Sequence, residues 1–76
     1  MVDILSRLFR VPVDRAFTVK GTGTVVTGTV WSGGLEREAT VRLEPGGREA
    51  RVRGLQAHGR DVDRISAGQR AAIALT

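Results

Sequence analysis

Short alternating stretches dominate the hydrophobic pattern of the chain and are typical of β-strands. The clearest is the last one, where Ala71, Ile73 and Leu75 fall on one face and Arg70 on the other. Residues 23–31 form a longer segment rich in valine and threonine, whose β-branched side chains favour extended backbone. The pattern therefore predicts strands and no internal helix.

Further strands are predicted between turn-forming residues. Segments 16–20, 40–44 and 49–58 alternate, residues 61–65 form a weaker strand, and turns are expected at 45–47 and 66–68. About six or seven short strands joined by glycine-rich turns predict an all-β fold, a small closed antiparallel β-barrel. We place this barrel domain at residues 9–76.

The alternation also predicts which side chains leave the core. Gly54 indicates a bulge that resets the phase of segment 49–58, so that Leu55 and Ala57 turn inward and their neighbours outward. Residues of three different segments are then expected together on the outer face of the barrel. They are Val25, Thr27, Gln56, His58 and Arg70.

The first eight residues show a different pattern. Apolar side chains recur there at helix-like spacing, and Asp3 is placed to cap a short turn. The apolar positions are Ile4, Leu5, Leu8 and Phe9. Because Pro12 disfavours helix at itself and at the preceding residue, this helical pattern cannot continue. We expect residues 1–8 to be a linker or the remnant of a preceding domain.

Composition narrows the partner class. The 76 residues include 12 basic and 8 acidic ones, for a net charge of +4, and no cysteine. A chain without cysteine has no disulfide framework and no thiolate metal site, which fits a cytoplasmic protein. Almost all the basic residues are arginine, whose planar guanidinium suits phosphates and stacks on bases. Nucleic acid is the natural partner, and an arginine-rich surface that merely reflects the source is the alternative.

The glycines of segment 20–34, KGTGTVVTGTVWSGG, raise the question of a phosphate-binding loop. A dinucleotide loop needs G-x-G-x-x-G followed by a helix, but Val26 stands where the third glycine belongs. A Walker loop needs a lysine after its last glycine, but Thr29 follows Gly28. Since the β-branched residues that follow are poor helix starters, we assign these glycines to bends of a barrel.

Catalytic and metal-binding patterns are not visible in the sequence. The chain has one histidine, and its carboxylates are scattered. Asp61 and Asp63 lie among arginines and are expected to form solvated ion pairs. His58 taken alone is more often a surface histidine than a ligand or a base. We therefore expect a binding module, with neither enzyme activity nor a cofactor of its own.

Two segments resemble the second domain of translational GTPases of the elongation factor Tu family. In that family P-[IV]-[ED]-x-x-F precedes G-x-G-T-V-V-T-G, and residues 12–28 read PVDRAFTVKGTGTVVTG. Residues 52–75, VRGLQAHGRDVDRISAGQRAAIAL, are similar to the QxH…AGQRxAL close of the selenocysteine-specific members, SelB. The resemblance covers about residues 9–76. One departure is the REA sequence at 37–39, where many relatives have a V-G-D turn.

The resemblance implies a module that binds aminoacyl-tRNA. In the family this domain contacts the 3′ end and the aminoacyl group of the charged tRNA, in a cleft shared with the GTPase domain. Selenocysteinyl-tRNA and that GTPase domain are the expected partners, and ribosomal RNA is a further candidate. GTP and magnesium would belong to the GTPase domain, whose G-x-x-x-x-G-K-[ST] motif this chain lacks.

Individual positions carry over from the family's binding residues. Those that align with the aminoacyl pocket are Asp14, Arg15, Phe17, Thr27, His58 and Arg70, and those near the terminal adenosine are Val25 and Gln56. A selenol is more acidic than a thiol, so selenocysteine is largely a selenolate at neutral pH. Arg15 and Arg70 would supply charge-assisted contacts to it, and Asp14 would orient an arginine or accept from the α-amino group.

Simpler interpretations of these residues stay open. Arg15 and Arg70 could pair with Asp14 on the barrel rim, and Phe17 could fill the core. Trp31 is expected to pack at the rim, with stacking on a base as the alternative. Arg51 and Arg53 on the outer face are candidates for contacts to phosphate or to the ribosome, or for a solvated face.

Two alternatives for the whole chain also remain. One is a stand-alone or engineered barrel without activity. The other is the equivalent domain of another translational GTPase, which holds an ordinary aminoacyl end or contacts only ribosomal RNA.

Overall fold

The computed structural model describes residues 2–6, 8–21 and 23–76, and these contain nine strands and no helix. In chain order the strands are β1 (Val2–Ser6), β2 (Phe9–Val19), β3 (Gly23–Thr29), β4 (Gly34–Glu36), β5 (Thr40–Glu44), β6 (Arg48–Ala57), β7 (Arg60–Val62), β8 (Arg64–Ser66) and β9 (Arg70–Leu75). The predicted all-β class is confirmed. The predicted strand at 61–65 is in fact two, β7 and β8, and β4 was not predicted.

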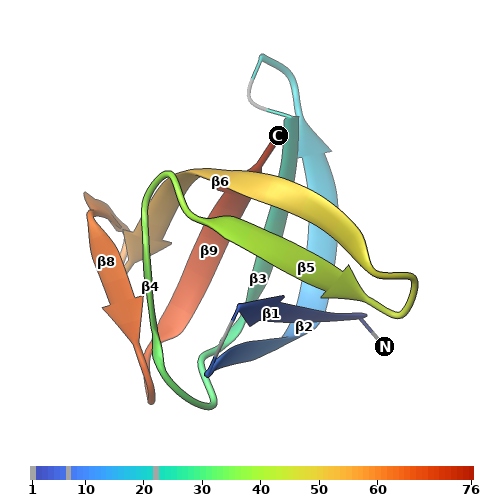
Figure 1. Ribbon diagram of the computed structural model, residues 1–76. Helices are drawn as coiled ribbons and strands as arrows, with labels where there is room; N and C mark the ends of the chain where they lie inside the picture. The colour runs from blue at the N-terminus through green and yellow to red at the C-terminus, as the bar shows by residue number, and fades with distance from the viewer. Residues whose placement is uncertain (1, 7, 22) are drawn as a thin grey trace.

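Six of the strands close into an antiparallel barrel. Their order is β5-β1-β2-β3-β9-β6, and a further pairing of β5 with β6 joins the two ends. Strand β7 adds to the outside edge of β6, and β4 pairs with β8 in a separate two-stranded ribbon at one side of the barrel (Figure 1). Closure leaves few free strand edges in a chain that is too short for a large core.

The two longest strands each serve two neighbours and turn the corners of the barrel. The first half of β2 pairs with β1 and the second half with β3, and the register shifts between Val13 and Arg15. Strand β6 pairs first with β5 and then with β9, and its register shifts between Val52 and Gly54. A bulge bends a strand and increases its twist, so one long segment can serve two partners. The predicted bulge at Gly54 is confirmed.

The start of the chain differs from the helical turn expected there. Val2–Ser6 is a strand that pairs with both β2 and β5, and Ile4 is fully buried in the core. The helix-like spacing of apolar residues has a simple origin. Ile4 and Leu5 belong to β1, and Phe9 begins β2 only three residues after β1 ends. The pairing outweighs the local pattern, as is common for short segments. The division of the chain into a linker at residues 1–8 and a barrel domain at residues 9–76 stays a prediction.

The core consists of the inward side chains of the strands, and none of the described buried residues is polar or charged. Buried hydrophobic residues are Ile4, Phe9, Val11, Val26, Val30, Leu35, Val41, Val52, Leu55, Ala57, Ile65, Ala71, Ile73 and Leu75. The predicted inward faces of the segments at 49–58 and 70–76 are confirmed by this set. Aliphatic side chains therefore provide most of the packing, as the shortage of aromatic residues requires.

Two backbone positions explain local sequence choices. A Cβ on Gly28 would lie 2.3 Å from the carbonyl oxygen of Pro12, so β2 and β3 can cross this closely only with glycine there. Glu38 has a φ of 73°, a left-handed conformation that a non-glycine residue adopts at a cost. It occupies the middle of the 37–39 turn, where the family pattern V-G-D has glycine.

Candidate functional site

The outer face of strands β2, β3, β9 and β6 carries the predicted site residues in cross-strand rows. The pairing of the strands aligns Phe17, Val25, Ala74 and Gly54 in one row. Two residues along each strand, a second row consists of Arg15, Thr27, Ala72, Gln56 and, on β7, Asp61. Because residues two apart point to the same side of a sheet, both rows face outward. We call them the apolar row and the polar row.

A charged group begins at Arg15, the end residue of the polar row on β2. Arg70 pairs with Thr29 in the β3–β9 ladder, two residues further along from Thr27 and Ala72. Asp14 lies at the bulge of β2, where Asp14 and Arg15 together oppose a single residue of β3. This extra residue turns two consecutive side chains to the outer face, which strict alternation forbids. The bulge therefore gathers Asp14, Arg15 and Arg70 at one end of the face.

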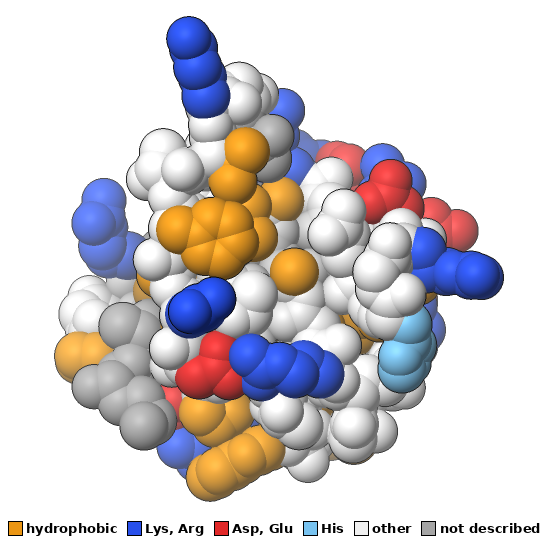
Figure 2. Space-filling view, turned by 180° about the vertical axis from the view of Figure 1, so that it is seen from behind, with side chains coloured by type: hydrophobic (Ala, Val, Ile, Leu, Met, Phe, Trp, Pro, Cys, Tyr) orange, Lys and Arg blue, Asp and Glu red, His pale blue; other side chains and the backbone are white. Residues whose placement is uncertain are grey.

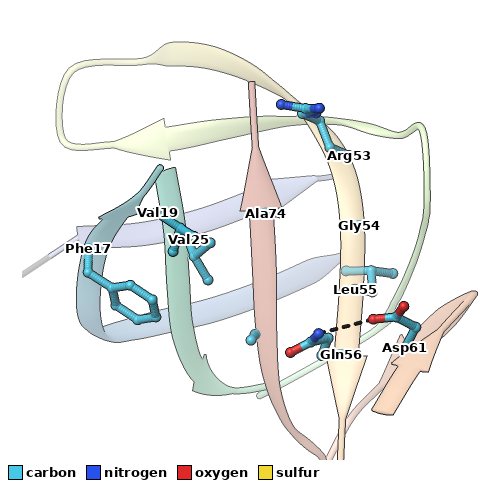
Figure 3. Close-up of a pocket in the computed structure, with 10 residues that line it drawn as sticks. Phe17, Val19, Val25, Arg53, Gly54, Leu55, Gln56, Asp61 and Ala74 are labelled. Atoms are coloured by element: carbon cyan, nitrogen blue, oxygen red, sulfur yellow. Dashed lines mark hydrogen bonds between the residues drawn. The ribbon is translucent and has the colours of Figure 1, made fainter. Parts of the chain in front are cut away.

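Small side chains in the middle of the two rows leave the face hollow. Ala72, Ala74 and Gly54 form the floor of a depression of about 470 Å³ that Phe17, Val25 and Gln56 also line. In Figure 3, Ala74 and Gly54 lie between Phe17 and Val25 on one side and Asp61 on the other. A second depression of about 210 Å³ shares Gln56 and Ala72 with the first. Its remaining lining includes Thr27, His58 and Arg70. The two hollows thus continue into each other across the polar row.

The face changes in chemical character from one end to the other. Figure 2 shows hydrophobic side chains gathered next to an adjoining group of basic and acidic ones on one side of the molecule. Phe17 is 45% exposed, so its ring is available to a ligand and is not the core filler considered above. A bound molecule that spans both hollows would meet an apolar surface at one end and charges at the other.

Asp14 is the centre of the charged group. The Arg70 guanidinium donates to both oxygens of its carboxylate, at 2.5 and 2.9 Å, and the Thr27 hydroxyl donates to one of them at 2.9 Å. These hydrogen bonds, first from Arg70 and then from Thr27, lower the pKa of Asp14 to about 2. The same contact raises the pKa of Arg70. The pairing of Arg70 with Asp14, considered above as an alternative, is therefore present.

Arg15 is the uncommitted cation of this group. Its guanidinium makes no hydrogen bond or ion pair with the residues that the structure describes, and its charge contributes to the lowered pKa of Asp14. Arg70 holds its planar fork on a carboxylate, whereas Arg15 is exposed beside it. Of the two arginines, Arg15 is the one that can take up an anion without first giving up a partner.

His58 reaches the site from a tight turn. It and Gly59 connect β6 to β7 with φ values of 55° and 75°, and the flanking residues Ala57 and Arg60 are paired. Positive φ at both central positions defines the two-residue turn that best fits the twist of a hairpin. The turn holds His58 at the edge of the smaller hollow, beside Arg70.

All eight residues proposed from the sequence lie on this one face, although their role as binding residues stays a prediction. The sequence did not indicate the floor of the hollow, Ala72, Ala74 and Gly54, because small residues carry no chemical signal of their own. It also assigned Asp61 to a solvated ion pair, whereas the Asp61 carboxylate accepts a hydrogen bond from the Gln56 amide at 3.0 Å.

Three other exposed residues, Trp31, Arg10 and Arg51, lie outside the hollows, whereas Arg53 lines the larger one. Trp31 is 63% exposed, and the guanidinium of Arg10 lies 4.9 Å from the centre of its ring, an arrangement typical of a cation–π contact. Arg51 is exposed and pairs with Glu38 at 2.9 Å. None of these three residues lines either hollow.

Comparison with known proteins identifies the family. Residues 23–76 match the family described as elongation factor Tu domain 2. The chain belongs to this family. The resemblance stated from PVDRAFTVKGTGTVVTG is thus confirmed, and the chain is a second-domain barrel of the translation elongation factor type.

Several of the similar proteins are selenocysteine-specific elongation factors, and others are elongation factor 1-alpha proteins. The chain is 51% identical over 73 residues to that factor from Desulfomicrobium baculatum, which covers 96% of the chain and 12% of the factor. It superposes on a crystal structure of the bacterial selenocysteine-specific elongation factor EF-Sec with a TM-score of 0.85 and 43% identity, over 90% of this chain and 12% of that one. For SelB of Methanococcus maripaludis in the apo form the TM-score is 0.89 at 34% identity, over 93% and 15%.

The described residues contain neither a cluster of metal-ligand side chains nor a membrane-spanning helix. Within residues 2–6, 8–21 and 23–76, no three histidine, cysteine or acidic side chains come together as metal ligands would. In the same ranges no helix has the length and hydropathy needed to cross a bilayer.

Proposed function

We propose that this barrel is a non-catalytic module that helps a SelB-like elongation factor hold the selenocysteinyl 3′ end of its tRNA. The observation that carries the proposal is the change in character along the outer face. Most residues that line the larger hollow are uncharged, with Arg53 and Asp61 as the exceptions, and the charged group of Asp14, Arg15 and Arg70 lies at the other end. An aminoacyl-adenosine has the same two ends, a flat base and a charged amino acid. The apolar row of Phe17 and Val25 suits the base, and the charged group suits the amino acid.

The chemistry of the amino acid supports selenocysteine as the preferred group. A selenolate is an anion at neutral pH, whereas the side chains of serine and cysteine are largely neutral. Arg15 offers an exposed guanidinium without a protein partner among the described residues. Asp14 holds Arg70, and its half-exposed carboxylate would also accept a hydrogen bond from a ligand's α-amino group. His58 and Thr27 complete the lining on either side of Arg70.

The rest of the factor's activity would lie outside this chain. The chain spans 12% of the length of the Desulfomicrobium relative and of the EF-Sec structure. GTP and magnesium would bind a GTPase domain that packs beside this barrel, in the cytoplasm. That domain would close the open side of the hollows over the aminoacyl group, so the barrel alone should bind its ligand weakly.

The affinity of the 76-residue chain for two aminoacyl-adenosines tests the proposal. Hydrolysis-resistant 3′-amide analogues that carry selenocysteine or serine would be titrated under reducing conditions and followed by NMR. We expect the selenocysteinyl analogue to bind about two- to fivefold more tightly, which is the range of an exposed ion pair. Arg15→Gln should remove this preference and leave the affinity for the seryl analogue nearly unchanged.

A matched control separates local from overall charge. Arg48→Gln changes the net charge by the same amount on an exposed arginine that lies outside the two rows and the charged group, opposite Leu43 in the β5–β6 pair. It should keep the preference for selenocysteine. Equal binding of both analogues by the unaltered chain would contradict the selenolate assignment and favour a domain for ordinary aminoacyl ends. Failure to bind either analogue would favour a scaffold without this activity.

A further inference from the structure

Gln56 and Asp61 form a fixed pair at the edge of the larger hollow. They are direct cross-strand partners in the β6–β7 hairpin, which is closed by the tight turn at His58 and Gly59. The Nε2 group of Gln56 donates to Oδ1 of Asp61 at 3.0 Å. Both side chains line the hollow together with Phe17 and Val25. The backbone ladder thus holds the amide and the carboxylate side by side on one face.

The chemistry of the carboxylate decides which way the amide faces. An ionised carboxylate only accepts hydrogen bonds, whereas an amide can donate through nitrogen or accept through oxygen. Gln56 must therefore turn its nitrogen to Asp61 and its oxygen away. Figure 3 shows this arrangement, with the nitrogen on the dashed line to Asp61 and the oxygen turned the other way, toward the neighbouring strand β9. Without Asp61, either end of the amide could face the hollow.

We infer that Asp61 is a positioning residue that makes Gln56 present a hydrogen-bond acceptor to the ligand. The inference rests on the proposed function and adds a specificity rule to it. The ligand must offer a donor at this point, whereas an acceptor there would meet a carbonyl oxygen and be disfavoured. In a terminal adenosine the candidate donors are the ribose 2′-hydroxyl and the 6-amino group of the base.

Gln56 lines both hollows and therefore lies where they meet. Gln56 lies in the polar row beside Ala72, whose methyl group has no hydrogen-bond donor to offer its oxygen. The Gln56 oxygen therefore stands at the boundary between the apolar hollow and the polar one, where a nucleoside joins its aminoacyl group. A single oriented acceptor at this point would fix the position of a ligand along the two hollows, which an open face does not fix by shape alone.

The first part of the test needs no ligand. In the intact chain, NMR should show nuclear Overhauser contacts from the Gln56 side-chain amide protons to the Asp61 methylene protons. It should also show slowed exchange of one amide proton with solvent. Asp61→Ala should abolish the slowed exchange. The control is Asp63→Ala, which removes the same charge from a side chain that is 95% exposed and lines neither hollow. An unchanged Gln56 amide in Asp61→Ala would overturn the inference.

The second part measures discrimination between ligands. The 3′-seryl-adenosine amide would be compared with one analogue that lacks the 2′-hydroxyl and another that lacks the 6-amino group. In the unaltered chain we expect one of these deletions to weaken binding about three- to tenfold, as the loss of a neutral hydrogen bond does. Which deletion does so identifies the donor. In Asp61→Ala the same deletion should cost less than about twofold, because the acceptor is no longer oriented. Asp63→Ala should keep the full effect.

The outcomes separate this inference from the proposed function. If seryl-adenosine binds and Asp61→Ala keeps the full discrimination, the inference is wrong and the proposed function stands. If adenosine derivatives bind with the expected discrimination but the aminoacyl group adds nothing, the inference stands and the proposed function is wrong. If no derivative binds the unaltered chain, both are contradicted.

Discussion

At the scale of single residues, the site depends on one carboxylate that organises its neighbours. Asp14 binds the fork of Arg70 with both oxygens and also accepts the hydroxyl of Thr27. Such bidentate pairs fix the orientation of an arginine better than a single contact does. The consequence is a division of roles, in which Arg70 is held in place and Arg15 keeps its charge available.

The pKa of Asp14 provides a direct check of this network. Hydrogen bonds from Arg70 and Thr27 lower it from 3.8 to about 2. Because the folded-state pKa is the lower one, the contribution of Asp14 to stability is present above pH 4 and is lost as the pH falls toward 2. Arg70→Ala should raise the pKa of Asp14 toward 3.8, as measured by carbon NMR of the carboxylate. It should also lessen the loss of stability between pH 4 and 2.

Arg48→Ala is the control for this experiment, because Arg48 is exposed and lines neither hollow. It should leave the pKa of Asp14 near 2. If the pKa of Asp14 stays near 2 in Arg70→Ala, the Arg70 guanidinium is not the main cause of the lowered pKa.

At the scale of the strands, the two bulges determine what faces outward. The bulge in β6 puts Gly54 into the floor of the hollow, and the one in β2 exposes Asp14 and Arg15 side by side. The close approach of β2 to β3 at Gly28 lies next to the bulge in β2, since Gly28 pairs with Val13 directly before the shift in register. The geometry of the site is therefore fixed by backbone pairing more than by side-chain contacts.

Gly28→Ala tests this dependence. The added Cβ would lie 2.3 Å from the Pro12 carbonyl oxygen and 2.8 Å from Cγ1 of Val11, so β2 would have to move away. We expect a loss of about 1–3 kcal/mol or more in the free energy of unfolding, measured with urea. Gly54→Ala is the matched control, since its Cβ would lie 4.0 Å from that of Ala74 and needs no rearrangement. It should change stability by no more than about 0.5 kcal/mol. Equal effects of the two variants would contradict the close crossing.

The sequence predicted the part of this arrangement that follows from alternation. The inward set of β9, the bulge at Gly54 and the outward turn of Gln56 could all be derived because each strand has a period of two. The bulge in β2 could not be predicted in this way. No glycine marks its position, and Asp14 and Arg15 are polar residues that also occur in regular strands. Strand β1 was missed because its partners lie far along the chain. Pairing over long separations leaves no local pattern.

At the scale of the whole molecule, a closed barrel supplies a rigid platform for a shallow site. Most of the site residues lie on paired strands, and His58 lies in a tight hairpin turn. Such elements hold side chains more accurately than long loops do. The exposed pair of Trp31 and Arg10 lies outside both hollows, so binding at the proposed site should leave it unchanged.

The central claim is that the outer face of β2, β3, β9 and β6 binds the aminoacyl-adenosine end of a tRNA. Backbone amide shifts of the labelled chain, recorded during titration with a hydrolysis-resistant 3′-aminoacyl-adenosine, test it most directly. We predict that the largest changes fall on the apolar and polar rows and the charged group. They should disappear in Ala74→Leu, which fills the hollow, and persist in Ala67→Leu on the exposed β8–β9 turn. Shift changes centred on Trp31 or on the β4–β8 ribbon, or no changes at all, would contradict the claim.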